Sequence, residues 1–507
     1  MCRGWRDQVE DGAGGGGGAA IPEDLTQPRA RWVCLVPIRY MVVVLGLLGC
    51  MLDYLMRFGL SVAIIAMTNS TRPVSQNFTP DHACPAAVNG SDDIYPVPTV
   101  LVTYVLATPQ GTGDFAWTVK EQGIILGTFF WGYFFTKTIG GRISELMGAR
   151  ETMAVSIWVS GVLCLLTPTM AAIHPLALAT LRFAMGIMQG PAFPSLYCVL
   201  ARWAPPEKLA TMTTIAFSGM SLGSVIAMGS SQWVVDHLGW QWVFWGAGIL
   251  GLIWTPFWIY FVRNSPCSHP LMSLQEQELL APNLAIKPKR NVPWSRLLRC
   301  WRFYPAILAE FASSWLANQT TNQGPSFLKA QVGFTMGEVS FVLTVGQTCC
   351  WVTAFTFGQL SDWLVQGVHL KKVNARRVIH LIAMVMIVLG LGSVVLAGCH
   401  KWVVSAMMMI TMMGSSATLS SFTLTPMDIA PNYAGTLSGM LGIGNIGGFL
   451  APIIAAEIVT QTGGWEASML VCGAVYFLAG VLYLVTATAD VQEWNDYEEL
   501  PSSDEGE

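Results

Sequence analysis

Twelve apolar runs, each long enough to cross a bilayer as a helix, constrain the fold of this chain more than any other feature. A spanning helix needs about 20 apolar residues, and 53% of the 507 residues are hydrophobic while 11% are charged. The runs cover residues 42–67, 121–141, 151–171, 176–201, 209–231, 242–262, 303–328, 338–360, 378–397, 403–426, 435–459 and 466–487. We therefore expect an all-α membrane protein with twelve transmembrane helices in two six-helix halves.

Two long connectors organise these runs. Residues 68–120 follow the first run, and residues 263–302 separate the sixth run from the seventh. The expected organisation is a disordered tail over residues 1–38, an N-terminal half over 39–262, a linker over 263–302, a C-terminal half over 303–488 and an acidic tail over 489–507.

Lysine and arginine are distributed unequally between the two sides of the expected membrane. With the N-terminus inside, 20 of the 27 lie in cytoplasmic segments and four lie outside. Because cytoplasmic loops carry the excess of basic residues, we expect both termini and the linker to be cytoplasmic. The connector 68–120 then lies outside, and its three N-x-[ST] sequons predict glycosylation at Asn69, Asn77 and Asn89.

A short motif occurs at equivalent places in the two halves. The second and eighth runs both end in G-x-[IL]-S-[DE], from Gly141 to Glu145 and from Gly358 to Asp362, with basic residues such as Arg150 just downstream. A carboxylate in such a turn can cap the N-terminus of the next helix and pair with arginine. We expect these five residues to govern the rocking of the two halves.

The fourth run contains an arginine and a glutamine. Arg182 and Gln189 are seven residues apart, which is two helical turns, so they share a face. A charge in hydrocarbon costs several kcal/mol and by default faces a bundle interior or a transport pathway. We predict that both residues contact the substrate; the alternative is that Arg182 extends to the membrane surface.

Ionisable residues also lie in the first, second and seventh runs. Arg57 is in the middle of the first run, and its guanidinium matches carboxylate or phosphate, so we predict that it binds the anion. Asp53, one turn earlier, is predicted to hold a co-transported cation, unless it and Arg57 neutralise each other. Glu310 is the second candidate for the cation, unless it pairs with a basic residue elsewhere. Lys137 is expected to extend to the inner surface.

Six blocks of sequence resemble one transporter family. They are residues 53–64 (DYLMRFGLSVAI), 127–133 (GTFFWGY), 202–207 (RWAPPE), 265–270 (SPCSHP), 427–431 (MDIAP) and 487–494 (ATADVQEW). In this order they are similar to the anion–cation symporter family of the major facilitator superfamily. That family includes sialin, the vesicular glutamate transporters and the type I sodium–phosphate cotransporters. The resemblance covers roughly residues 39 to 494.

The resemblance implies the major facilitator fold and cation-coupled transport of anions by alternating access. Family members carry an arginine at the position of Arg57, and usually an apolar residue at that of Asp53. Sialin and the glutamate transporters carry a carboxylate where this chain has Gln189, whereas the sodium–phosphate branch has glutamine, so the chain resembles that branch most. Glutamate transporters carry an arginine where this chain has Ser313 and a histidine where it has Tyr197, which makes glutamate a poor candidate. Tyr197 is included among the substrate-binding candidates.

Other classes of function are not supported by the sequence. The segments 219–223 and 442–447 match G-x-S-x-G and G-x-G-x-x-G, but both lie inside apolar helices with no preceding strand. We interpret them as packing faces, and we expect no enzyme activity, metal site or cofactor. The net charge of −4 gives no indication of a nucleic-acid partner. None of the seven histidines lies deep in a run, so no histidine proton relay is expected.

The predicted function is cation-coupled symport, with sodium favoured, of inorganic phosphate or a small organic anion. The alternative is a proton-coupled lysosomal or vesicular exporter of acidic sugars or amino acids, and a minor alternative is a membrane receptor that does not transport. The expected partners are the anion, the bilayer and sorting adaptors that bind the segment from Tyr497 to Leu500. The plasma membrane is the favoured location, and endosomal or lysosomal membranes are the alternative.

Overall fold

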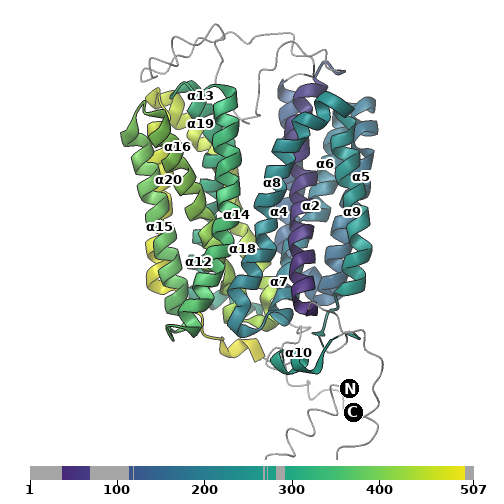
Figure 1. The fold of residues 1–507 in the computed structure, drawn as a ribbon, viewed down its shortest axis with the longest axis vertical. Coiled ribbons are helices and arrows are strands. Elements are labelled where there is room, and N and C mark those ends of the chain that lie inside the picture. Colours follow the sequence, from purple (N-terminus) through teal and green to yellow (C-terminus); the bar gives the residue numbers. More distant parts are fainter. Residues whose placement is uncertain are drawn as a thin grey trace, which may run out of the picture.

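The computed structural model describes residues 37–68, 114–117, 119–266, 269–270, 272–280 and 292–496. It is a bundle of roughly parallel helices in two groups (Figure 1). The first group is α2 (Ile38–Met67), α4 (Val119–Met147), α5 (Ala149–Ile173), α6 (Pro175–Gln189), α7 (Ala192–Trp203), α8 (Leu209–Leu238) and α9 (Gln241–Phe261). The second group is α12 (Tyr304–Ala317), α13 (Gly324–Ala330), α14 (Met336–Gln366), α15 (Lys372–Ala397), α16 (Lys401–Ala417), α17 (Thr425–Ile429), α18 (Ala434–Leu441), α19 (Ile446–Thr462) and α20 (Glu466–Thr486).

Ten helical segments within the described residues are long and apolar enough to cross a membrane. The two other expected spans are more polar, although they lie in the same bundle. Helix α4 carries several charged residues, among them Lys137 and Glu145, and α12 continues through the polar π-helix Asn318–Gln323 into α13. Among the described residues, extended pairing is limited to one isolated bridge between Thr68 and Phe115. The expected all-α membrane fold is confirmed.

Several spans are broken in the membrane interior. The fourth span divides into α6 and α7 at Gly190 and Pro191, and proline provides no backbone N–H for the helical ladder. The tenth and eleventh spans contain 3₁₀ turns, including Gly442–Asn445. A Cβ at Gly444 would lie 2.7 Å from the carbonyl oxygen of Ile307 in α12. The G-x-G-x-x-G segment is therefore a packing face, as the sequence indicated.

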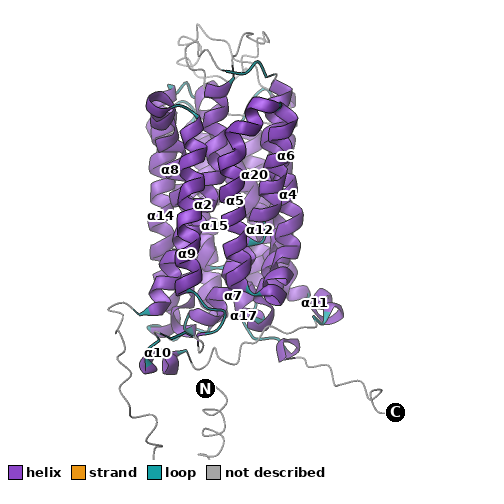
Figure 2. Ribbon diagram, turned by 90° about the vertical axis from the view of Figure 1, so that its right-hand side faces the viewer, coloured by secondary structure: helices purple, strands orange, loops and turns teal. Residues whose placement is uncertain are grey.

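The two groups of helices converge toward one end of the bundle. We call it the linker end, because the linker helices α10 (Leu274–Leu279) and α11 (Trp294–Arg299) lie there (Figures 1 and 2). Near this end α18 packs against α4 and α7, and α14 packs against α8. Hydrogen bonds between the groups join the ends of α4 and α14 to the starts of α18 and α8. Thr213 of α8 also contacts the sulfur of Met427 in α17, and Gln366 donates to the carbonyl of Glu207.

The two repeated motifs make the same contact across the halves. The carboxylate of Glu145 accepts hydrogen bonds from the backbone N–H of Thr436 (2.7 Å) and from its hydroxyl (2.6 Å), at the start of α18. The carboxylate of Asp362 accepts from the N–H groups of Ala210 (3.2 Å) and Thr211 (2.8 Å), at the start of α8. Each acid thus caps a helix of the opposite half, not the next helix in the chain as the sequence suggested. Glu145 also binds Arg142, at 3.1 Å.

The glycines of the motifs allow the backbones to approach closely. A Cβ at Gly141 would clash with the carbonyl of Gly435, and a Cβ at Gly358 would clash with the hydroxyl of Thr214. Both clashes lie between the halves, so a side chain at either position would force the linker ends of the two halves apart.

The arginines downstream of the motifs do not form ion pairs with the motif carboxylates Glu145 and Asp362 in the described structure. Arg150 donates to the carbonyl of Ile259 (2.6 Å) and pairs with Glu151 (3.3 Å), both inside the N-terminal half. It makes no described hydrogen bond to the other half. In the C-terminal half the buried Arg376 pairs with Asp428 (3.0 Å) and donates to the Ser361 hydroxyl (2.6 Å). Arg376 was not predicted from the sequence, although it also lies in the helix that follows the repeated motif.

Replacing Glu145 with alanine should separate the linker ends, because α18 loses its cap. A cap contributes about 1 kcal/mol, so the ratio of separated to closed molecules should rise about fivefold. Double electron–electron resonance measures the distance between the linker ends, with spin labels attached at the exposed positions Leu146 and Trp363 through Leu146→Cys and Trp363→Cys.

The matched control is Glu338→Ala at the opposite end. Glu338 caps its own helix α14 through Thr335 and makes no contact across the halves in the described part of the chain. If the distance between the two spin labels increases equally in Glu145→Ala and Glu338→Ala, the cap between the halves has no special part in holding the linker end closed.

Candidate substrate and coupling site

Arg57 lies in an aromatic cage formed by Tyr54, Phe58, Phe129, Phe130 and Tyr133. Its guanidinium carbon is 4.6 to 4.9 Å from the ring centroids of Tyr133, Phe130 and Phe129, and 5.5 and 5.8 Å from those of Tyr54 and Phe58. Such contacts stabilise a cation in a partly desolvated place. No described carboxylate lies within ion-pair distance of Arg57, so its charge is available to an anion.

The cage extends to the contact between the halves. The Phe130 ring, which covers Arg57, is 6.0 Å from the ring of Phe449 in α19. Trp131 and Phe134 also contact Phe449, at 5.9 and 6.2 Å between centroids. One aromatic layer therefore connects Arg57 in the N-terminal half to the C-terminal half, which is where a transporter of this build binds its substrate.

Asp53 is buried without a partner. The residue is 1% exposed, and neither carboxylate oxygen has a hydrogen-bond donor among the described residues. No ion-pair contact joins Asp53 to Arg57 among the described residues, but the positive charge of Arg57 acts on the Asp53 carboxylate from one helical turn away. The alternative that the two charges neutralise each other therefore stays a prediction beside the first. A buried charge without hydrogen-bond donors is costly, and the binding of a cation at this carboxylate stays a prediction.

Glu310 is paired with Lys137 across the halves. The Lys137 Nζ is 3.9 Å from the Glu310 Oε1, and the two side chains are 15% and 19% exposed. The lysine stem lies against Gly442, where an added Cβ would be 3.1 Å from three of its carbons. The expectation that Lys137 extends to the inner surface is therefore wrong, because its ammonium group has a carboxylate partner inside the bundle.

Arg182 is enclosed within the N-terminal half. It is 2% exposed, and its guanidinium donates to the backbone carbonyls of Arg57 (2.9 Å) and Met56 (3.4 Å). This position does not fit the alternative that Arg182 extends to the membrane surface. It fixes the turn of α2 that carries Arg57, and its role in binding substrate stays a prediction.

Gln189 and Tyr197 lie on either side of the break in the fourth span. Gln189 is fully buried, and neither atom of its amide has a partner among the described residues. The break packs against α4, since a Cβ at Gly190 would be 2.7 Å from the backbone nitrogen of Lys137. Tyr197 is 7% exposed and its ring centroid is 4.7 Å from that of Phe217. Contact of Gln189 and Tyr197 with the substrate stays a prediction.

One buried histidine was missed by the sequence analysis. His380 is 1% exposed, its Nδ1 is 3.3 Å from the Ser421 hydroxyl, and its ring is 4.7 Å from that of Tyr483. The apolar run was expected to begin at residue 378, but α15 begins at Lys372, so His380 lies two turns inside the helix. It lies in the C-terminal half, with Phe422, Tyr476 and Tyr483 around its ring.

Comparisons with known proteins identify the family. The profile of the Major Facilitator Superfamily matches residues 46–452. The chain belongs to the major facilitator superfamily. Human sialin is 27% identical over 470 residues, covering 90% of this chain and 91% of sialin. Vesicular glutamate transporter 3 of Danio rerio is 26% identical over 479 residues, covering 91% of this chain and 75% of that protein.

A solved structure confirms the fold independently. The proton:xylose symporter XylE superposes with a TM-score of 0.63 at 14% identity, covering 89% of this chain and 97% of that one. This major facilitator protein is therefore a multi-pass membrane transporter and not an enzyme. The predicted glycosylation sites Asn69, Asn77 and Asn89, and the segment from Tyr497 to Leu500, lie outside the described residues.

The pairing of Lys137 with Glu310 predicts a strong energetic coupling. Lys137→Met and Glu310→Gln should each destabilise the protein, because each leaves one unpaired charge in the bundle. The double variant should recover part of the loss, with a coupling of about 1 kcal/mol or more in the free energy of unfolding in detergent micelles.

The exposed pair Lys401–Glu338 is the matched control, because its side chains are 32% and 47% exposed and lie 3.3 Å apart within one half. Its coupling should be about 0.5 kcal/mol or less. A coupling for Lys137–Glu310 no larger than this would contradict the pairing.

Proposed function

We propose that the protein is a cation-coupled symporter of small organic anions, which bind at Arg57 while the cation binds at Asp53. The observation that carries the proposal is a pair of opposite charges one helical turn apart on α2 that make no ion-pair contact, beside the contact between the halves. A site that alternates between the two sides needs charges that the protein itself does not neutralise.

The cage around Arg57 favours an organic anion over inorganic phosphate. A carboxylate can accept two parallel hydrogen bonds from the planar guanidinium group of Arg57. The hydrocarbon part of the anion can then pack against the rings of Phe129, Phe130 and Tyr133. Phosphate offers no apolar surface to these rings. The names of the relatives agree with this class, since glutamate is an organic anion.

Asp53 is the better of the two candidates for the coupling cation. Glu310 already has Lys137 as its partner, whereas Asp53 has none in the described structure. A sodium ion or a proton bound at Asp53 would remove the cost of the buried charge. Sodium is the cation that Gln189 and the resemblance to the sodium–phosphate branch favour, and it is the one we propose.

We further propose that the linker end faces the cytoplasm in the plasma membrane. The basic residues gather on this side of the chain, and cytoplasmic loops carry such an excess. The closed linker end then makes this structure the form that is shut toward the cytoplasm.

Arg57→Ala should abolish transport of the anion. Purified protein in liposomes is tested with labelled lactate, succinate and phosphate under an inward sodium gradient and then under an inward proton gradient. Loss of a charge-assisted bond should lower uptake at least about tenfold, and Arg57→Lys should restore only part of it because the fork is lost. The exposed Arg299→Gln is the control.

The pattern of uptake distinguishes the candidates. Sodium-driven uptake of a carboxylate that is lost in Arg57→Ala supports the proposal, whereas uptake of phosphate alone overturns the substrate class. Uptake driven only by protons would support the second candidate, a sialin-like proton-coupled exporter, which the 27% identity to human sialin favours. Undiminished uptake in Arg57→Ala would show that the anion binds elsewhere.

Asp53→Asn should uncouple transport from the cation. Asparagine is neutral, so the site no longer gains from binding a cation, and accumulation against a gradient should fall to the level of equilibration. The measurement is the steady-state ratio of labelled anion inside and outside the liposomes. Glu310→Gln is the comparison. If Glu310→Gln loses accumulation while Asp53→Asn keeps it, the cation binds at Glu310 and not at Asp53.

A further inference from the structure

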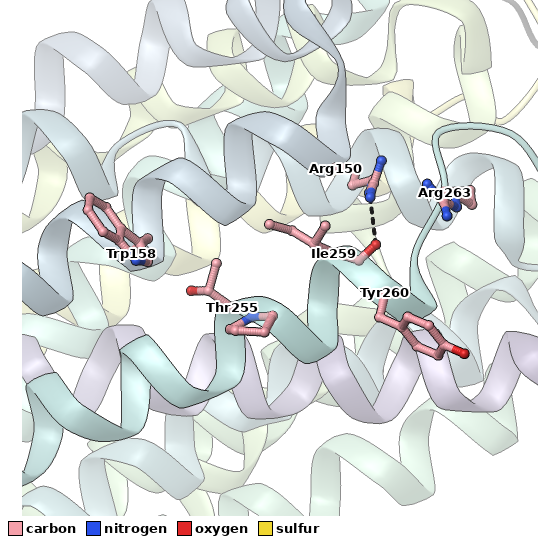
Figure 3. A pocket seen from close by; sticks show the side chains of 7 residues that line it. Arg150, Trp158, Thr255, Ile259, Tyr260 and Arg263 are labelled. Atoms are coloured by element: carbon pink, nitrogen blue, oxygen red, sulfur yellow. Dashed lines mark hydrogen bonds between the residues drawn. The ribbon is translucent and has the colours of Figure 1, made fainter.

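A groove of about 490 Å³ lies on the outside of the N-terminal half, between α5 and α9. It is lined by Arg150, Trp158, Thr255, Pro256, Ile259, Tyr260 and Arg263 (Figure 3). None of these residues belongs to the aromatic cage or to the contacts between the halves described above.

The groove has a basic end and an apolar end. Arg150 and Arg263 lie close together at one end, while Trp158 lies at the other, beyond Thr255 and Ile259 (Figure 3). Arg150 is the second residue of α5, and Arg263 follows the last residue of α9 by two positions, so the basic end is at the linker end of the bundle. Trp158 is eight residues further along α5, about 12 Å toward the membrane interior.

The basic end is held in place by several hydrogen bonds. The Trp258 indole donates to the backbone carbonyl of Arg150 (3.0 Å), and the side chain of Asn264 accepts from the backbone N–H of Arg150 (2.9 Å). The Arg150 guanidinium donates to the Ile259 carbonyl and pairs with Glu151, which leaves its Nε without a partner. No described carboxylate pairs with Arg263, so one positive charge of this end is uncompensated.

The apolar end is open toward the lipid. The Trp158 side chain at this end is 50% exposed, and Ile259 and Tyr260, nearer the basic end, are 42% and 63% exposed. All three belong to membrane-spanning helices. Pro256 lies inside α9 and cannot donate to the preceding turn, a common origin of local irregularity in a helix. The groove thus runs from the membrane interface into the hydrocarbon.

We propose that this groove binds one anionic phospholipid, with its phosphate at Arg263 and Arg150 and one acyl chain along Ile259, Pro256 and Trp158. A soluble anion would use the basic end alone and would leave the apolar end without a function. A zwitterionic lipid such as phosphatidylcholine could also place its phosphate at Arg263, but its choline would bring a positive charge to an end that already holds two arginines. Anionic lipids of the cytoplasmic leaflet are attracted to basic residues beside membrane helices, and the basic end lies on the side that we assign to the cytoplasm.

Lipid retention tests the proposal without any transport assay. The full chain, purified in detergent, is incubated with equal amounts of phosphatidylserine and phosphatidylcholine, and the lipid that remains after gel filtration is measured by mass spectrometry. Wild type should retain phosphatidylserine preferentially. Arg263→Gln should lower this preference about fivefold, the effect of one basic residue at an anionic surface, and Arg150→Gln should also lower it.

The controls distinguish lipid binding in the groove from a general attraction of basic surface residues for anions. Arg299→Gln removes an exposed arginine of α11 outside the groove and should change nothing. Soluble glycerophosphoserine and inorganic phosphate should not displace the lipid, because they lack the acyl chain. Arg150→Gln loses its bond to Ile259 and can destabilise α9, so Arg263→Gln, which has no such described contact, decides the outcome. An undiminished preference in folded Arg263→Gln, an equal loss in Arg299→Gln, or displacement by the soluble anions would overturn the proposal.

Discussion

The structure depends on two carboxylates that each cap a helix belonging to the other half of the molecule. Glu145 binds the start of α18, and Asp362 binds the start of α8. Both acids are largely buried, and a buried carboxylate is stable only with hydrogen-bond donors around it. The backbone donors come from the opposite half, and only Arg142 of its own half also binds Glu145. Opening the linker end therefore removes most of these hydrogen bonds and must expose the acids to water.

The site deeper in the bundle follows from this closed end. With the ends of α4 and α18 fixed, Lys137 lies against Gly442 and reaches Glu310 of the C-terminal half. Two turns further, Phe130 contacts both Arg57 and Phe449. The contacts between the halves thus change along α4 from charged to aromatic. Arg57 and Asp53 stand beside this layer, and neither forms an ion-pair contact within the described residues.

The sequence predicts much of the fold because the membrane allows few solutions. Apolar runs must become helices, since hydrocarbon cannot satisfy backbone groups, and the two motifs mark equivalent turns in the two halves. The runs at α4 and α12 were found although their charged and polar residues make them the least apolar spans. The helix starts were less accurate, which is how His380 was placed near the surface when it is buried in α15.

The charged residues of the candidate site could be recognised in the sequence, but their pairing could not. Arg57, Asp53, Glu310 and Lys137 were recognised because a charge in an apolar run is rare. Which charges meet depends on distances between helices far apart in sequence, so neither the Lys137–Glu310 pair nor the Arg376–Asp428 pair could be read from spacing. The direction of the motif carboxylates, across the halves rather than along the chain, is also a property of the tertiary packing.

In the proposed mechanism, Arg57 binds the anion while Asp53 binds the cation. This mechanism is tested most directly by exchange of labelled anion across liposomes that hold equal concentrations of anion and cation on both sides. The account predicts that wild type exchanges only when the cation is present, that Asp53→Asn exchanges with or without it, and that Arg57→Ala does not exchange at all. Exchange by Asp53→Asn that still requires the cation, or exchange by Arg57→Ala at the wild-type rate, would contradict the account.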